Sequence, residues 1–241
     1  MTTIFLDHHS TTPPSEAVID AVTRAMRVAG NASSSHEGGK AAAKIVEDAR
    51  RCVAETMGGV DPADVYFTSG ATESNGIVLR SIVDGENERG RRPHIVTSAI
   101  EHSAILVPLR QLAKRGQCTF TAVPVGASGI VNPADVARAM RPDTVLVSVM
   151  GGQNEVGTIQ PIEEIAAIAH ARGVPMHSDL CQSFGKVPLR GFDFASASAH
   201  KLHGPTGTGC VLIPQRFLAR MSVPALGGSQ QNGVRGGTLN L

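Results

Sequence analysis

Short apolar segments alternate with longer amphipathic segments along most of this chain, and this alternation constrains the fold more than any other feature. The strands that we expect from the pattern are 94–98, 119–123, 144–150 and a segment that ends at Asp179. The expected helices lie between them, at 102–114, from Pro133 onward and at 162–172. Such alternation is typical of a mostly parallel sheet covered by helices. The sequence therefore predicts a three-layer α/β/α sandwich.

A lysine follows the apolar segment 192–197, at the end of the run Ser-Ala-His-Lys that finishes at Lys201. An ammonium group is costly to bury, so a lysine at the end of a buried strand calls for a chemical use, such as condensation with an aldehyde. Asp179 ends another predicted strand, and Gln182 follows it. A lysine and a carboxylate at two strand ends are what pyridoxal phosphate (PLP) requires. Taken singly, each half is also typical of a solvated surface turn.

The segment 68–75, Thr-Ser-Gly-Ala-Thr-Glu-Ser-Asn, joins a predicted strand to a predicted helix. Its glycine permits a sharp turn, and the N–H groups of Ala71 and Thr72 would point at an anion from the start of the helix. Ser198 and His200 could complete a phosphate site from the lysine side. The same letters fit an ordinary capping box, which needs no ligand. The segment alone leaves both interpretations open.

Two further polar residues follow predicted strands. His102 could stack on a cofactor ring and exchange protons with a substrate, although an unpartnered histidine at a helix start is also common. The amide of Asn154 could hydrogen-bond ring substituents or the substrate. Both would lie with the lysine and the aspartate at the carboxyl ends of strands, where open α/β sheets bind their ligands.

Several segments resemble the class V aminotransferase group of fold-type I PLP enzymes, and within that group the cysteine desulfurases. They are 6–13, 31–36, 68–75, 101–102, 154–157, 177–182, 198–205 and 236–240. The resemblance implies that residues 1–241 form the PLP-binding large domain of such an enzyme.

The resemblance also implies roles for the site residues. Lys201 would carry the cofactor, Asp179 would pair with the ring nitrogen, and Gln182 would contact the phenolic oxygen. His102 would stack on the ring, and Asn154 would orient ring and substrate. The phosphate would be bound by Ala71, Thr72, Ser198, His200 and, across a homodimer with shared active sites, Thr238 of the neighbouring subunit.

By resemblance, the complete reaction converts L-cysteine to L-alanine and transfers sulfur to an acceptor thiol, for iron–sulfur cluster or other sulfur-compound biosynthesis. In the family, the thiol and the arginine that binds the substrate carboxylate lie beyond the segment that ends here at Leu241. We therefore expect this chain to lack a C-terminal small domain and to need it for full activity. The alternatives are a selenocysteine lyase, an aminotransferase, a non-catalytic PLP-binding partner, and one half of a split enzyme.

The four cysteines show neither CxxC spacing nor a disulfide framework, so we expect no metal site. Cys181 lies between Asp179 and Gln182, and in an extended segment its side chain would point opposite to its immediate neighbours. We therefore expect it to be a packing residue. A net charge of +1 argues against a nucleic-acid partner. Without a membrane-length apolar run or a signal peptide, the expected location is the cytoplasm.

Overall fold

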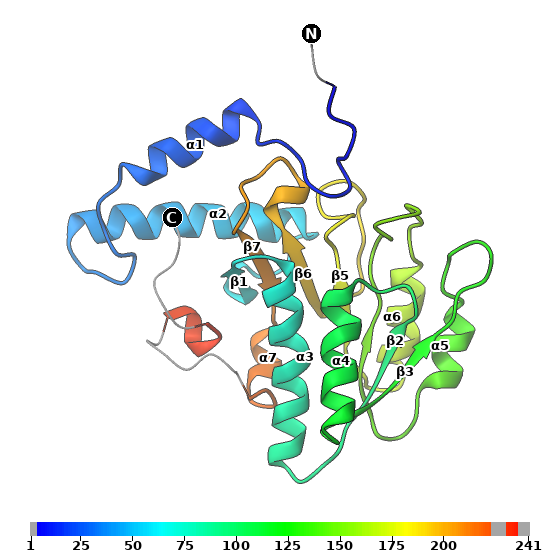
Figure 1. Cartoon of the computed structure of the whole chain (residues 1–241). Helices are drawn as coiled ribbons and strands as arrows, with labels where there is room; N and C mark the ends of the chain where they lie inside the picture. The colour runs from blue at the N-terminus through cyan, green and yellow to red at the C-terminus, as the bar shows by residue number, and fades with distance from the viewer. Residues whose placement is uncertain (1–3, 223–229, 236–241) are drawn as a thin grey trace.

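The computed structural model describes residues 4–222 and 230–235, and a seven-stranded sheet forms the centre of this part of the chain (Figure 1). The strands are β1 (Val65–Thr68), β2 (His94–Ser98), β3 (Thr119–Val123), β4 (Thr144–Ser148), β5 (Met176–Asp179), β6 (Phe194–Ser198) and β7 (Gly209–Leu212). Their spatial order is β1-β7-β6-β5-β4-β2-β3. The pairs from β3 across to β6 are parallel, whereas β7 runs antiparallel to both of its neighbours.

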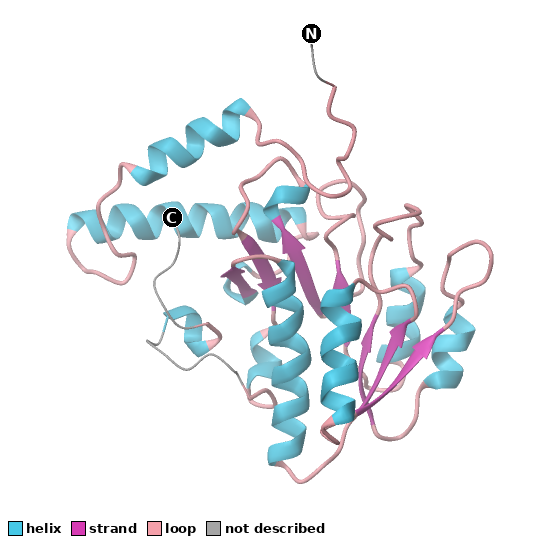
Figure 2. Cartoon of the chain, in the orientation of Figure 1, coloured by secondary structure: helices cyan, strands magenta, loops and turns pink. Residues whose placement is uncertain are grey.

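Helices cover both faces of this sheet (Figure 2). The α-helices are α1 (Glu16–Met26), α2 (Glu37–Thr56), α3 (Ala71–Glu88), α4 (Ser103–Lys114), α5 (Pro133–Ala139), α6 (Ile162–His170) and α7 (Gln215–Leu218). Short 3₁₀ helices occur at Pro62–Asp64, Ala199–Lys201 and Gln230–Gly233. No helix of the described residues is both long enough and apolar enough to cross a membrane.

Adjacent residues of the central strands pack into different cores, because successive side chains of a strand point to opposite faces. Ile95 and Leu146 pack with α3 and α4, and their neighbours Val96 and Val147 pack with α5 and α6. A third cluster packs the end of α2 against β1, β6 and β7. These contacts confirm the predicted mostly parallel α/β/α sandwich.

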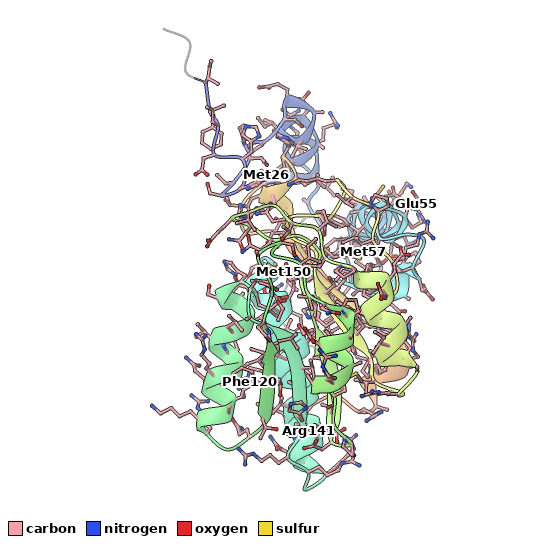
Figure 3. All side chains as sticks on the ribbon, turned by 90° about the vertical axis from the view of Figure 1, so that its right-hand side faces the viewer. Met26, Glu55, Met57, Phe120, Arg141 and Met150 are labelled. Carbon is pink, nitrogen blue, oxygen red and sulfur yellow. The ribbon has the colours of Figure 1, made fainter. Side chains whose placement is uncertain are left out.

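Two elements end earlier than predicted. The strand predicted to reach Met150 ends at Ser148, and the N–H of Met150 donates to the Glu101 carboxylate at 2.9 Å. The helix predicted to reach residue 172 ends at His170, and Gly173 follows with φ of 69°, the left-handed conformation that commonly follows a helix. Figure 3 shows Arg141, which precedes β4, near the bottom of the view and Met150, which follows β4, near its middle.

Candidate functional site

A pocket of about 500 Å³ opens at the carboxyl ends of the parallel strands. The sequence-predicted site residues that line it are Ala71, Thr72, His102, Asn154, Asp179, Gln182, Ser198, His200 and Lys201. Thr238 lies outside the described residues. The pocket lies where α3, α4 and the later loops follow the carboxyl ends of the strands, which is where such folds bind ligands.

Lys201 ends the 3₁₀ turn that directly follows β6. Its Nζ donates hydrogen bonds to the carbonyl oxygens of His9 at 2.6 Å and Ser10 at 2.7 Å. Gln182 donates from Nε2 to the same His9 carbonyl at 2.8 Å. The N-terminal segment 7–13 therefore forms a wall of the pocket, and Asp7, His9 and Ser10 are lining residues to which the sequence analysis gave no role.

Thr12 anchors this segment to the lysine turn. Its hydroxyl donates to the carbonyl oxygen of His200 at 2.8 Å and accepts from the N–H of His203 at 2.6 Å. His203 has φ of 56°, a left-handed conformation that is strained for a residue with a side chain. The two bonds thus hold both sides of the turn that carries Lys201.

The start of α3 faces the lysine turn across the pocket. Ser198 at the end of β6 accepts a hydrogen bond from the N–H of Ala71 at 2.7 Å. Gly70 takes the N-cap position with φ of 148°, so no side chain of its own caps the helix. A Cβ on Gly209 would come within 2.5 Å of the Gly70 Cα, so only glycine permits this approach.

Segment 68–75 forms only part of a capping box. Glu73 accepts from both the N–H and the hydroxyl of Ser69, each at 2.6 Å, and pairs with Arg235 at 2.6 Å. The hydroxyl that caps the first turn, however, comes from Ser198 on a distant strand rather than from the cap residue itself. The positive end of the α3 dipole therefore faces a pocket lined by hydroxyl and imidazole groups, as an anion requires.

Asp179 is a buried carboxylate at the end of β5. Its Oδ2 accepts from Nδ2 of Asn75 at 2.7 Å, and its Oδ1 accepts from the N–H of Cys181 at 3.0 Å. Asn75 is fully buried, and its Oδ1 has no hydrogen-bond partner within the described part of the chain. Asn75 was missed as a site residue although it closes the segment 68–75 that the sequence singled out.

Cys181 and its immediate neighbour Gln182 both line the pocket, contrary to the prediction that they point to opposite sides. The chain does not stay extended after Asp179: the N–H of Phe184 donates to the carbonyl of Leu180 at 2.7 Å, and the segment turns. Burial and the negative charge of Asp179 raise the pKa of the Cys181 thiol well above its usual range. The thiol is therefore neutral and a poor nucleophile, because the thiolate is the reactive form.

The two histidines of the site are held from different directions. His102 caps α4, with its Nδ1 accepting from the N–H of Ala104 at 3.1 Å. His200 lies 3.1 Å from the Thr11 hydroxyl through its Nδ1, and burial and the charge of Lys201 lower its pKa. These contacts of Nδ1 orient the two imidazole rings, and both rings line the same pocket.

The described residues include no group of three or more His, Cys, Asp or Glu side chains that could hold a metal ion. The polar groups of the pocket include one lysine amine, one buried carboxylate, imidazoles, and amides and hydroxyls around a helix start. This set suits an organic cofactor that carries an aldehyde, a ring nitrogen and a phosphate.

Known proteins match this chain over nearly its whole length. The aminotransferase class-V family matches residues 4–238. The cysteine desulfurase IscS of Azotobacter vinelandii is 39% identical over 98% of this chain, and the chain spans 59% of the length of that relative.

Two solved structures show the same architecture. A structure of SspA in complex with cysteine superposes with a TM-score of 0.91 at 30% identity, covering 98% of this chain and 69% of that one. DndA from Streptomyces lividans gives a TM-score of 0.86 at 39% identity, covering 98% of this chain and 68% of that one. Class V aminotransferases use PLP. The family match and the arrangement of lysine, carboxylate and helix start agree, and this chain belongs to the class V aminotransferase family.

Proposed function

We propose that the pocket holds PLP and that the protein built on these residues is a cysteine desulfurase, which releases L-alanine from L-cysteine and passes the sulfur to an acceptor thiol. One observation carries the proposal: Lys201, the buried Asp179 and the start of α3 line one pocket. The likeness to the desulfurase of Azotobacter vinelandii and to a structure that contains cysteine supports the choice of substrate.

The phosphate of the cofactor would lie at the start of α3. Ala71 and Thr72 offer backbone and hydroxyl groups at the positive end of the helix dipole, and Ser198 and His200 face them from the end of β6. The fit depends on the close approach of Gly209 to Gly70, which leaves no space for a side chain between β7 and the helix start. The proposal includes Thr238 of a second subunit as a further phosphate ligand.

The pyridine ring would lie above Asp179. A carboxylate whose oxygens accept from Asn75 and Cys181 is fixed in direction, and it would hold a proton on the ring nitrogen. When bound in this way, PLP supplies an electron sink for the bonds of the substrate α-carbon. Gln182 would bind the phenolic oxygen through the amide that faces the His9 carbonyl.

The remaining roles concern the substrate. The amine of Lys201 would hold the cofactor and, once free, would move the proton at the substrate Cα. His102 would stack on the ring and exchange protons with the substrate, and Asn154 would orient ring and substrate. The neutral thiol of Cys181 is a poor sulfur acceptor, so the proposal places the acceptor thiol elsewhere.

The proposal extends to assembly and location. We expect a homodimer with shared active sites, in which these residues form the cofactor-binding large domain, and a sulfur-accepting or scaffold protein as a partner. Cys52, Cys118, Cys181 and Cys210 are all free thiols, which suits a reducing compartment such as the cytoplasm.

Reduction of the PLP-loaded protein with borohydride tests the proposal. We expect a visible absorption band, fixation of the cofactor on Lys201 in a peptide map, and loss of both in Lys201→Ala. Lys114→Ala, at the end of α4 and outside the pocket, is the matched control and should keep the band. Alanine formed from L-cysteine distinguishes desulfuration from transamination, which would give a keto acid instead. A folded protein that stays colourless in excess PLP would disprove the cofactor site.

A further inference from the structure

Glu101 is a buried carboxyl group that the proposed function does not use. It lies in the loop between β2 and α4 with an exposed fraction of 6%. Its Oε1 accepts two hydrogen bonds, from the Ser98 hydroxyl at 2.5 Å and from the N–H of Met150 at 2.9 Å. Its Oε2 is buried and has no hydrogen-bond partner among the residues that the structure describes.

The surroundings of Glu101 favour the uncharged acid. Burying the charge of a carboxylate with only one hydrogen-bonded oxygen costs more than burying the neutral acid, although the O–H of the acid would also have no acceptor among the described residues. The charge that acts on Glu101 from a neighbouring element is that of Asp179 at the end of β5, and it repels a second anion. On its own loop, His102 turns its Nδ1 to the N–H of Ala104. Burial and Asp179 raise the pKa of Glu101 to about 8, against the two hydrogen bonds that lower it.

Glu101 also joins the two loops that form one wall of the pocket. Ser98 ends β2 and Met150 follows β4, and these strands are paired in the sheet. The residue after Glu101 is His102, and the chain after Met150 continues to Gly152 and Asn154, all of which line the pocket. A single carboxyl oxygen therefore connects the loop that carries His102 to the loop that carries Asn154.

We propose that Glu101 is a positioning residue that acts as a neutral carboxylic acid and ties the His102 loop to the Met150 loop beside the buried carboxylate of Asp179. The effect on cofactor binding rests on the proposed function, whereas the charge state of Glu101 does not. Sequence alone marks Glu101 only as part of a family motif, because its role depends on a contact with a residue 49 positions away.

Urea unfolding of the wild type and of Glu101→Gln between pH 5 and 9 tests the charge state. A proton that is bound in the folded chain but lost in the unfolded chain makes stability fall as pH rises. Relative to Glu101→Gln, the folding equilibrium constant of the wild type should fall about tenfold per pH unit from near pH 4.5 to about 8. Above that pH, the ratio of the two folding constants should stay level. Glu55→Gln, an exposed glutamate on α2, is the matched control and should run parallel to the wild type.

The connection between the loops is tested by comparing Glu101→Gln with Glu101→Ala at pH 7. Glutamine keeps an oxygen for Ser98 and Met150, so PLP affinity should stay within about twofold of wild type, and alanine leaves both donors unpartnered and should cost about tenfold or more. Parallel pH profiles of wild type and Glu101→Gln, or equal losses in both variants at pH 7, would overturn the proposal. If the wild type binds no PLP but the pH profiles diverge as expected, the proposed function fails and the neutral state of Glu101 stands. In that case the loop connection is judged from unfolding: equal stability of Glu101→Gln and Glu101→Ala at pH 7 would disprove it.

Discussion

Asn75 and Asp179 are joined by a side-chain hydrogen bond of 2.7 Å, although they are 104 positions apart in the chain. Asn75 lies in the second turn of α3 and Asp179 ends β5, so this bond fixes the direction of a buried carboxylate relative to the helix that begins at the phosphate site. The distance between the ring-nitrogen partner and the phosphate ligands of the proposed cofactor site is thereby set by one helix.

Replacing Asn75 by alanine should weaken the site without abolishing the fold. The Asp179 Oδ2 would lose a buried donor, which typically costs about 1–3 kcal/mol. We expect a lower free energy of unfolding by that amount and weaker PLP binding, measured by urea titration and by absorbance. Ser15→Ala, which removes the exposed N-cap of α1, is a control that should leave PLP affinity unchanged. An Asn75→Ala variant with wild-type stability and affinity would contradict the role of this bond.

Asp179→Asn should weaken PLP binding far more than Gln182→Ala. Only the first change removes the charge that would face the ring nitrogen, and a charge-assisted hydrogen bond typically contributes about 1.5–3 kcal/mol, or roughly ten- to hundredfold in affinity. Titration of both variants with PLP, followed by the absorption of the bound cofactor, measures the difference. Small and equal losses would show that Asp179 is not at the pyridine nitrogen.

Thr12→Val should loosen the lysine turn, because the variant cannot donate to the carbonyl of His200 or accept from the N–H of His203. Two lost bonds in a part-buried site should lower the free energy of unfolding by about 1–3 kcal/mol and slow the fixation of PLP on Lys201. Thr12→Ser retains the hydroxyl and should behave much like the wild type. If serine and valine are equally damaging, the methyl group rather than the hydroxyl holds the segment.

Cys181 should react slowly with alkylating reagents despite lining the pocket. Its raised pKa keeps the thiolate scarce at pH 8, whereas Cys52 is exposed. Mass spectrometry of peptides after brief iodoacetamide treatment should find Cys52 labelled first, with Cys181 about tenfold or more slower. In a protein that supplies the acceptor thiol from another segment or partner, Cys181→Ser should leave alanine formation largely intact. Rapid labelling of Cys181, or loss of turnover in that variant, would restore it as a sulfur acceptor.

His177 should make the fold sensitive to acid. It is fully buried between the hydroxyls of Ser148 and Ser196, and burial lowers its pKa to about 4 from 6.5. Because the unfolded chain binds a proton that the folded chain excludes, stability falls as pH drops from about 6.5 to 4 and then levels off. His177→Asn should lack this component in urea titrations over the same range, and an unchanged slope in the variant would contradict it.

Local patterns predicted the parts of the molecule that depend on neighbouring residues. The alternation of apolar segments identified the core strands and helices, and the rule that parallel strands end at one edge placed Lys201, Asp179 and His102 near each other before any contact was known. The apolar run at 209–213 predicts the strand β7, but not its antiparallel direction, because the direction of a short strand depends on which neighbour it pairs with.

The details that sequence could not supply are long-range contacts and a turn. Alternation along a strand failed for Cys181, because the chain stops being extended at Asp179. Asn75 and Glu101 looked like ordinary members of a helix and a loop; their importance comes from partners on other strands, which no spacing within the sequence reveals.

The anchoring of segment 7–13 on the lysine turn has a consequence for synthesis on the ribosome. Thr12 emerges early, but its partner His200 lies 188 residues later. At a translation rate of about 5–20 residues per second, the segment waits on the order of 10–40 s before the turn exists. One wall of the pocket can therefore close only late in translation, and an N-terminal fusion that captures this segment during the wait would interfere with assembly of the site rather than with the sheet.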